Sequence, residues 1–116
     1  MTNEKVFQMP VSKVYPLLVG KAERKGRTKA EADTVIRWFT GYDQASLDAL
    51  AASDVSYGDF FRNAPALHPN REQITGVVCG VRAESVENPL MRELRRLDKL
   101  IDELSKGKPL EKILRA

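Results

Sequence analysis

The sequence is poor in the residues that build covalent crosslinks and metal centres. It contains one cysteine, Cys79, and one histidine, His68, among 116 residues. A single cysteine excludes a disulfide within the chain, and these two side chains on different predicted elements cannot supply the clustered ligands of a zinc site. We therefore expect no metal and no cofactor. We expect His68 to be a solvated loop residue and Cys79 to be a small buried side chain.

Long apolar runs and recognised catalytic motifs are absent as well. No stretch approaches the roughly 20 apolar residues that cross a bilayer, and the segment VFQMPVSKVYP after Lys5 is not typical of a signal peptide. We therefore expect a cytoplasmic protein without membrane contact. The sequence has no G-x-S-x-G turn, phosphate-binding glycine loop or dinucleotide-binding fingerprint. No residue is assigned a catalytic role, and no motif favours an enzyme.

Charge of one sign is not in large excess. The chain has 19 Lys and Arg against 16 Asp and Glu, a net charge of +3, and the excess is spread over both halves. This balance allows nucleic-acid contact without indicating it. The hydrophobic content of 42% and the charged content of 30% are typical of a globular domain. We predict one domain over residues 1–116, in which residues 1–10 are a loosely held lead-in segment.

The strongest pattern in the sequence is an amphipathic helix near residues 89–106. Asn88 is a good N-cap, Pro89 suits the first helical position, and Gly107 provides a stop. Apolar residues recur at alternating steps of four and three along one face: Leu90, Leu94, Leu97, Ile101 and Leu104. The spacing lasts about two heptads, which is too short to favour a coiled coil.

Capping residues predict four more helix starts: Ser12, Thr28, Asp43 and Ser56. Gly26 and Gly41 should end the first two of these helices. The first would use the apolar residues Val14, Leu17, Leu18 and Ala22. The second would bury Ala32, Val35, Ile36 and Phe39, with Trp38 on its flank. The two short helices that follow would bury Leu47 and the pair Phe60 and Phe61.

Residues 70–81 are predicted to form a further helix. Asn70 and Gln73 have the capping spacing, and the apolar residues Ile74, Val77, Val78 and Val81 follow at helical intervals. Gly76 and Gly80 would lie on the opposite side, against another helix. A buried strand at VVCGV is the alternative. With a last amphipathic piece around Leu110, Ile113 and Leu114, we predict an all-α single compact domain of five to seven helices packed around residues 89–106.

Four strings in the chain are similar to a known family. They are KAERKGRTKAEAD, IRWFTGYDQASL, ITGVVCGVR and NPLMRELRRLDKLIDELSKGKPLEKILRA. They resemble a small bacterial family classed as domain of unknown function 2200, and the resemblance runs from about residue 11 to residue 116. It implies a free-standing cytosolic bacterial protein. It brings no activity, cofactor, partner or catalytic residue.

Two charged segments are candidates for a functional role. The acids Asp98, Asp102 and Glu103 lie at helical distances from basic residues, which favours a solvated, self-neutralising face over acid–base chemistry. The basic run at residues 21–29 straddles a glycine turn between two predicted helices, and this resembles a helix-turn-helix. Its candidate nucleic-acid contacts are Lys21, Arg24, Lys25, Arg27 and Lys29. The acids Glu31 and Asp33 on the second helix would repel phosphate.

The segment at residues 37–43 has the highest density of side chains that are common at binding sites. Arg37, Trp38 and Tyr42 form the candidate binding surface. The alternative is that Trp38 belongs to the core and that this corner has only a structural role. Substitution of Arg37 and Tyr42 by alanine would distinguish the two, because a binding surface can be lost without a loss of thermal stability.

Three functions follow from these patterns, in order of preference. The first is a protein-interaction module that could self-associate into a homo-oligomer, because the helical stripe and the apolar tail together offer more apolar surface than a small domain needs. The alternative is a nucleic-acid-binding protein that uses residues 21–29. The third is a small-molecule-binding protein or an enzyme without a recognisable motif.

Overall fold

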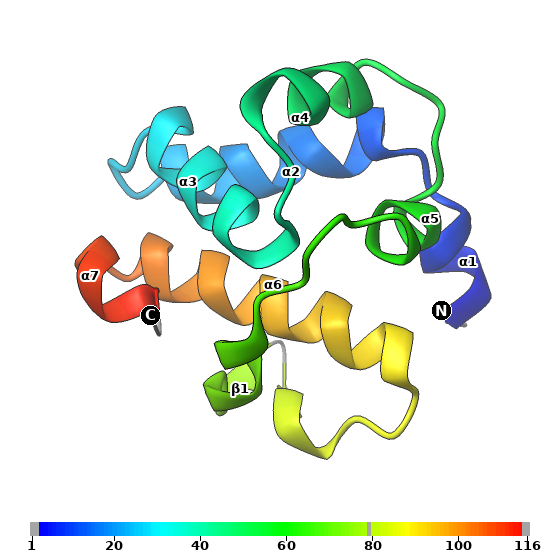
Figure 1. The fold of residues 1–116 in the computed structure, drawn as a ribbon. Coiled ribbons are helices and arrows are strands. Elements are labelled where there is room, and N and C mark those ends of the chain that lie inside the picture. The colour runs from blue at the N-terminus through cyan, green and yellow to red at the C-terminus, as the bar shows by residue number, and fades with distance from the viewer. Residues whose placement is uncertain (1–2, 79, 115–116) are drawn as a thin grey trace.

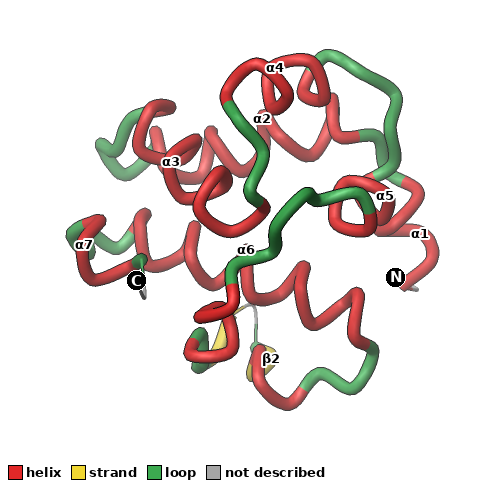
Figure 2. Tube along the Cα trace, in the orientation of Figure 1, coloured by secondary structure: helices red, strands yellow, loops and turns green. Residues whose placement is uncertain are grey.

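The computed structural model describes residues 3–78 and 80–114, so the prediction for Cys79 lies outside the described residues. The α-helices in this part of the chain are α1 (Asn3–Gln8), α2 (Val11–Glu23), α3 (Lys29–Thr40), α4 (Gln44–Ala51), α5 (Tyr57–Arg62), α6 (Pro89–Ser105) and α7 (Leu110–Ile113). Two short 3-10 helices, η1 (Pro69–Gln73) and η2 (Ala83–Ser85), flank a two-stranded antiparallel sheet of β1 (Val77–Val78) and β2 (Val81–Arg82). The chain is therefore mostly helical, as predicted, but not purely so (Figure 2).

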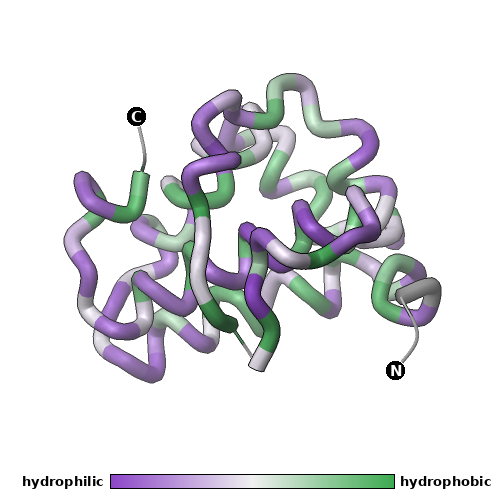
Figure 3. Tube along the Cα trace, turned by 90° about the horizontal axis from the view of Figure 1, so that it is seen from below, coloured by the Kyte–Doolittle hydropathy of each residue, from purple (hydrophilic) through white to green (hydrophobic). Residues whose placement is uncertain are grey.

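Helix α6 is the centre of the fold. It runs beneath α2, α3 and α4 in Figure 1, with α5 packed near its first half and α7 folded back beside its last turn. The Asn88 side chain accepts a hydrogen bond from the backbone N–H of Met91 at 3.0 Å, which is the predicted cap. The predicted stripe is buried within the same chain, with Leu97, Ile101 and Leu104 at 0% exposure. Hydrophobic and hydrophilic residues alternate along the helices (Figure 3), which is the pattern that one shared core requires.

Three of the four predicted helix caps are present. Thr28 and Glu31 form the reciprocal capping box, Asp43 accepts from the N–H of Ser46 at 2.7 Å, and Ser56 accepts from the N–H of Asp59 at 3.2 Å. The prediction at Ser12 is wrong, because the N-cap of α2 is the extended Pro10, two residues earlier, and the helix begins at Val11. Proline has no side-chain acceptor, so the helix starts without a side-chain cap, and the N–H of Val11 donates to the carbonyl of Val55.

The predicted helix over residues 70–81 is wrong. Its first residues form η1, and Val78 pairs with Val81 across a tight β-hairpin. Gly76 and Gly80 have φ values of +115° and +78°, a backbone region that glycine adopts freely and that an α-helix does not use. Ile74 and Val78 are buried as expected, whereas Val77 and Val81 are 48% and 37% exposed.

The N-terminal segment is held in place by backbone hydrogen bonds. Helix α1 packs against α5. The N–H of Val11 donates to the carbonyl of Val55 at 2.8 Å, and the N–H of Tyr57 donates to the carbonyl of Met9 at 2.7 Å. These two bonds flank an isolated bridge between Pro10 and Ser56, and together they position Tyr57 beside α2. Within the described residues, no helix combines the length and apolar character needed to span a bilayer.

One apolar residue of α2 departs from the prediction. Leu17 was expected to share the inner face of this helix with Val14 and Ala22, but its side chain is 63% exposed. Val19 is buried in its place at 7% exposure. Leu17 instead stands at the rim of a cavity, and that cavity is the main feature of this side of the protein.

Candidate ligand-binding cavity

A cavity of about 290 Å³ lies where α1, α2, α5 and α6 meet. Its walls are mainly apolar. Val6 comes from α1, Met9 from the link to α2, Val14, Leu17 and Leu18 from α2, and Met91 and Leu94 from α6. Three lining residues have polar side chains: Tyr57, Arg95 and Asp98. An apolar concavity with a few convergent polar groups is the usual form of a small-molecule site.

The hydroxyl of Tyr57 is buried and has no hydrogen-bond partner. The residue is 4% exposed, and its ring is fixed by Phe60 and Phe61, with ring centroids 5.9 and 4.9 Å away. Burial, and then the negative charge of Asp98, raise the pKa of the Tyr57 hydroxyl well above its ordinary value. A buried polar group left without a partner costs about 1–3 kcal/mol, so this hydroxyl needs a partner that the described part of the chain does not supply.

Asp98 is the second unusual group in the cavity. Burial raises its pKa from 3.8 to about 6, although the positive charges of Arg95 and Lys21 oppose that shift. Its nearest charged partner is the guanidinium of Arg95, with 3.6 Å between N and O, which is longer than a hydrogen bond. No hydrogen-bond donor reaches its carboxylate within residues 3–78 and 80–114. Perturbed acids in a cavity are typical of binding and catalytic sites.

A larger, more open groove of about 490 Å³ lies between α1, α5 and the start of α6. Its apolar residues include Phe7, Phe61 and Leu90. Its polar groups already have partners: Glu93 accepts from Arg71 at 2.6 Å, and Arg62 donates to Asp59 at 2.9 Å. Because these polar side chains already have hydrogen-bond partners within the fold, the groove is a weaker candidate for a ligand site than the smaller cavity.

Each of the three residues of the predicted binding surface contacts another part of the chain. Trp38 stacks on His68 with ring centroids 4.0 Å apart and an interplanar angle of 18°. His68 is therefore not a freely solvated loop residue; it is half-buried, and its Nδ1 accepts from the N–H of Asn70 at 3.0 Å. Tyr42 donates to the carbonyl of Phe60 at 2.7 Å, which links the loop between α3 and α4 to α5. Arg37 donates to Thr34 at 3.2 Å.

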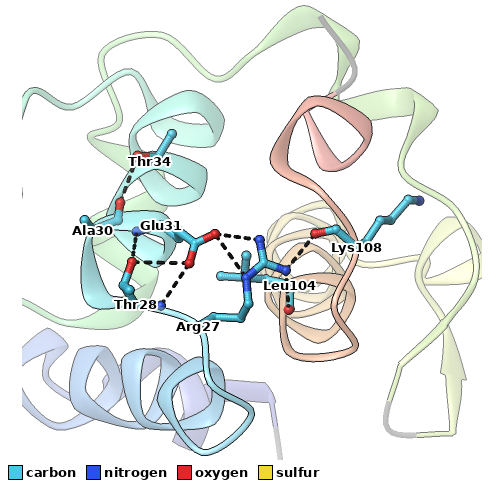
Figure 4. A network of polar contacts seen from close by, with 7 residues as sticks. All are labelled: Arg27, Thr28, Ala30, Glu31, Thr34, Leu104 and Lys108. Atoms are coloured by element: carbon cyan, nitrogen blue, oxygen red, sulfur yellow. Dashed lines mark hydrogen bonds and ion pairs between the residues drawn. The ribbon is translucent and has the colours of Figure 1, made fainter.

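Most of the basic segment at residues 21–29 is engaged within the fold. Arg27 donates to Glu31 and to the carbonyls of Leu104 and Lys108, at distances of 2.6–3.1 Å, and so joins the α2–α3 turn to the α6–α7 turn (Figure 4). Lys21 pairs with Asp102 at 3.3 Å, and Lys29 pairs with Asp33 at 2.8 Å. Within the described residues, Arg24 and Lys25 are exposed and have no ion pair.

The acidic face of α6 agrees in part with the prediction. The ion pairs Arg95–Asp98 and Asp102–Lys106 are present, the second at 3.0 Å. Lys99 lies 3.8 Å from Asp102 and donates to the carbonyl of Val77. Asp98 also lines the cavity, and its side chain is 23% exposed. Among residues 3–78 and 80–114, no group of three His, Cys, Asp or Glu side chains is placed to hold a metal ion.

Sequence reasoning missed Tyr57 and the cavity. The sequence did contain one signal for Asp98. It lies four residues after Leu94 and three before Ile101, so it shares a helix face with these two buried apolar residues. Tyr57 offered no comparable signal. Its place in the cavity depends on the backbone hydrogen bond to Met9, which joins segments far apart in the chain.

Comparisons with known proteins identify relatives without naming an activity. The model of a bacterial family, described as an uncharacterized protein conserved in bacteria (DUF2200), matches residues 5–115. The crystal structure of the uncharacterized protein SP1917 is similar, with 46% sequence identity over 97% of this chain and 93% of that chain, and a TM-score of 0.92. A comparison with curated proteins finds no match. The chain therefore belongs to the bacterial protein family DUF2200, in agreement with the resemblance noted in its sequence.

Proposed function

We propose that the protein binds a small, mainly apolar ligand in the cavity between α2, α5 and α6. The observation that carries this proposal is a mainly apolar cavity whose lining includes Tyr57, a residue with an almost fully buried hydroxyl that has no hydrogen-bond partner in the described part of the chain. A ligand that hydrogen bonds to this oxygen would remove its desolvation cost. This corresponds to the third of the three functions that the sequence suggested.

The size and the lining of the cavity support a small ligand. Ligand sites usually measure about 300–1,000 Å³, and the 290 Å³ of this cavity lies at the lower limit. Met9 and Met91 contribute flexible thioether side chains, which adapt to ligands of different shape. Seven of the ten lining residues are apolar and three have polar side chains, so the ligand would be mainly apolar with a polar group.

A titration with hexanol tests the proposal. Amide signals in a two-dimensional NMR spectrum should shift at residues of α2, α5 and α6 that line the cavity, and a Leu18→Trp variant should lose the response because the indole fills the space. Leu67→Trp is the matched control, since Leu67 is also half-buried but lines the other groove. Unchanged spectra at millimolar hexanol, or equal binding by the Leu18→Trp variant, would contradict the proposal.

A protein partner is the second candidate function. Leu17, at the rim of the cavity, is 63% exposed, and an apolar side chain of that size at a cavity mouth favours contact with another protein. The reason for self-association is weaker than the sequence suggested, because the α6 stripe is covered by the chain itself. Sedimentation of the wild-type protein and of a Leu17→Lys variant, above about micromolar concentration, would show whether Leu17 mediates a homo-oligomer.

A further inference from the structure

We infer that two copies of this chain form a symmetric dimer in which the Leu17 side chain of each copy enters the apolar cavity of the other. This inference rests on the second candidate function, a protein partner at Leu17, and names that partner as the same protein. It is carried by the position of an exposed apolar side chain beside an apolar cavity, on one face of the molecule. The interface does not use the buried stripe of α6.

Leu17 is an apolar side chain that the fold leaves outside its own core. At 63% exposure it is the most exposed large apolar residue in the described part of the chain. It lies on α2 at the rim of the cavity, whose wall also includes Val14 and Leu18 of the same helix. Burial of one exposed leucine at an interface strengthens association by about 10- to 100-fold.

The cavity is large enough to receive a leucine side chain. Its volume is about 290 Å³, and its lining is mainly apolar. In another protein, an apolar cavity of about 150 Å³ takes up benzene, which has more carbon atoms than the side chain of leucine. Met9 and Met91 belong to the lining, and their flexible side chains can adjust to the entering group.

The presence of Leu17 and the cavity on one face favours a second copy as the partner. A two-fold interface is isologous, which means that the same patch on both copies meets itself. A face with only a projecting side chain, or only a cavity, does not complement itself in this way. Here a two-fold axis beside Leu17 places two leucines in two cavities, so both insertions form in one association step.

The backbone of α2 beside Leu17 is open to close contact. Gly20 lies three residues after Leu17 and therefore on the same side of the helix. Apart from its chain neighbours and the helix backbone, no atom lies within 4 Å of the position that a Cβ would take at Gly20. No side chain of the fold obstructs a second helix at this point.

Opposite charges also meet in this arrangement. Lys13, one turn before Leu17, is exposed and has no ion pair among the described residues. In the cavity wall, the Asp98 side chain is 23% exposed, and its partner Arg95 is 3.6 Å away. As Leu17 enters the cavity, Lys13 would approach this acid of the partner. Exposed ion pairs contribute little affinity, so this contact orients the two copies and the leucines hold them together.

Complementation between two variants tests the reciprocal insertion. Sedimentation of the wild-type protein should show a dimer at about 100 micromolar. Leu17→Lys removes the entering side chain and Leu18→Trp fills the cavity, so each variant alone should associate about a hundredfold more weakly. An equimolar mixture restores one insertion, from the Leu18→Trp copy into the Leu17→Lys copy, and should associate about tenfold more tightly than either variant.

Two matched controls change the same kinds of side chain elsewhere. Ala45→Lys adds a positive charge at an exposed site on α4, and Leu67→Trp adds an indole at the other groove. Both should remain as dimeric as the wild-type protein.

Hexanol provides a second measurement, on the wild-type protein itself. It would occupy the same space as the partner's Leu17, so millimolar hexanol should shift the wild-type dimer toward the monomer. Binding of hexanol in the cavity is measured by NMR with the Leu17→Lys variant, in which no leucine of a second copy competes for the site.

The outcomes separate this inference from the proposed ligand-binding function. If the wild-type protein is a monomer at about 100 micromolar and hexanol binds the Leu17→Lys variant, the dimer is overturned and the ligand site stands. If the protein is a dimer and hexanol does not bind that variant, the ligand-binding function fails and the dimer stands.

Three results would overturn the insertion even in a protein that self-associates. The first is a Leu18→Trp variant that associates as tightly as the wild-type protein. The second is a mixture of the two variants that associates no more tightly than each alone. The third is hexanol that binds the Leu17→Lys variant but leaves the wild-type dimer intact. This last comparison needs no change inside the cavity, so it stays decisive if Leu18→Trp folds poorly.

Discussion

Two sites in this protein each combine a tyrosine, an aspartate and a basic residue, and they differ in how many hydrogen bonds the aspartate receives. The first joins Tyr15, Asp33 and Lys29 between α2 and α3. The second joins Tyr57, Asp98 and Arg95 between α5 and α6. At the first site Asp33 accepts hydrogen bonds from Tyr15, from Lys29 at 2.8 Å and from Gln44 at 3.1 Å. At the second site, no hydrogen bond among the described residues reaches the Asp98 carboxylate.

The acidities of the two aspartates follow from this difference. Burial alone would raise the pKa of both. At Asp33 the hydrogen bonds from Lys29, Tyr15 and Gln44 outweigh burial and hold the pKa below its ordinary value. At Asp98 burial prevails and the pKa is about 6. The comparison indicates that a buried acid with hydrogen-bond partners stabilises the fold. An acid such as Asp98, which is 23% exposed at a cavity and receives no hydrogen bond from the described residues, is available for a ligand.

The largest expected effect is at the satisfied site. Asp33→Ala removes the acceptor of three hydrogen bonds and leaves the donors of Tyr15 and Gln44 without it, which should lower the free energy of unfolding by about 3 kcal/mol. Urea denaturation at pH 7.5 measures this loss. A loss below about 1 kcal/mol would mean that the network contributes little, and the contrast between the two sites would fail.

The next prediction, for Asp98, is a gain in the free energy of unfolding rather than a loss. The folded pKa of Asp98 lies above its unfolded value, so folding is favoured when this group is protonated, and the free energy of unfolding falls as the pH rises from about 4 to about 6. Asp98→Asn removes that loss and should raise the free energy of unfolding at pH 7.5 by about 1–2 kcal/mol. At pH 3.5 the two proteins should be almost equally stable. If the variant is less stable than the wild-type protein at pH 7.5, the Asp98 carboxylate has favourable partners in the folded state, and the prediction is wrong.

The tyrosines give a smaller pair of effects. Tyr15→Phe removes a hydroxyl that donates to Asp33 and should cost about 1 kcal/mol of unfolding free energy. Tyr57→Phe removes a hydroxyl without a partner and should cost nothing or be slightly stabilising. The same urea denaturation measures both, with each variant as the control for the other. Equal losses in the two variants would indicate that Tyr57 has a hydrogen-bond partner in solution.

Much of the helical framework could be predicted from the sequence, because its signals are local. The caps at Thr28, Asp43, Ser56 and Asn88 each involve residues three positions apart, and the stripe of α6 repeats within one helix. Such signals do not depend on the rest of the fold. They located the starts of α3, α4, α5 and α6.

The hairpin was missed because its local signal was ambiguous. Four apolar residues between 74 and 81 have helical spacing, and the same residues are compatible with two short strands. The glycines carried the decisive information. Gly80, just before Val81, is typical of a tight turn between strands, whereas two glycines within a helix would each have cost about 1 kcal/mol.

The cavity could not be predicted, because no local pattern encodes it. Tyr57 and Asp98 are 41 positions apart in the sequence, and both line the cavity only after Tyr57 is bonded to Met9 and α6 is packed on α2. The absence of a hydrogen bond is likewise a property of the folded surroundings. A sequence shows which groups can donate or accept, and only the fold shows which of them stay unpaired.

The most direct test is the carboxyl titration of Asp98 and Asp33 in the same sample, followed by carbon-13 NMR. In the free protein, Asp98 should titrate at about pH 6 and Asp33 below its ordinary pKa of 3.8. An Asp98 that titrates at or below 3.8 in the free protein would contradict the account.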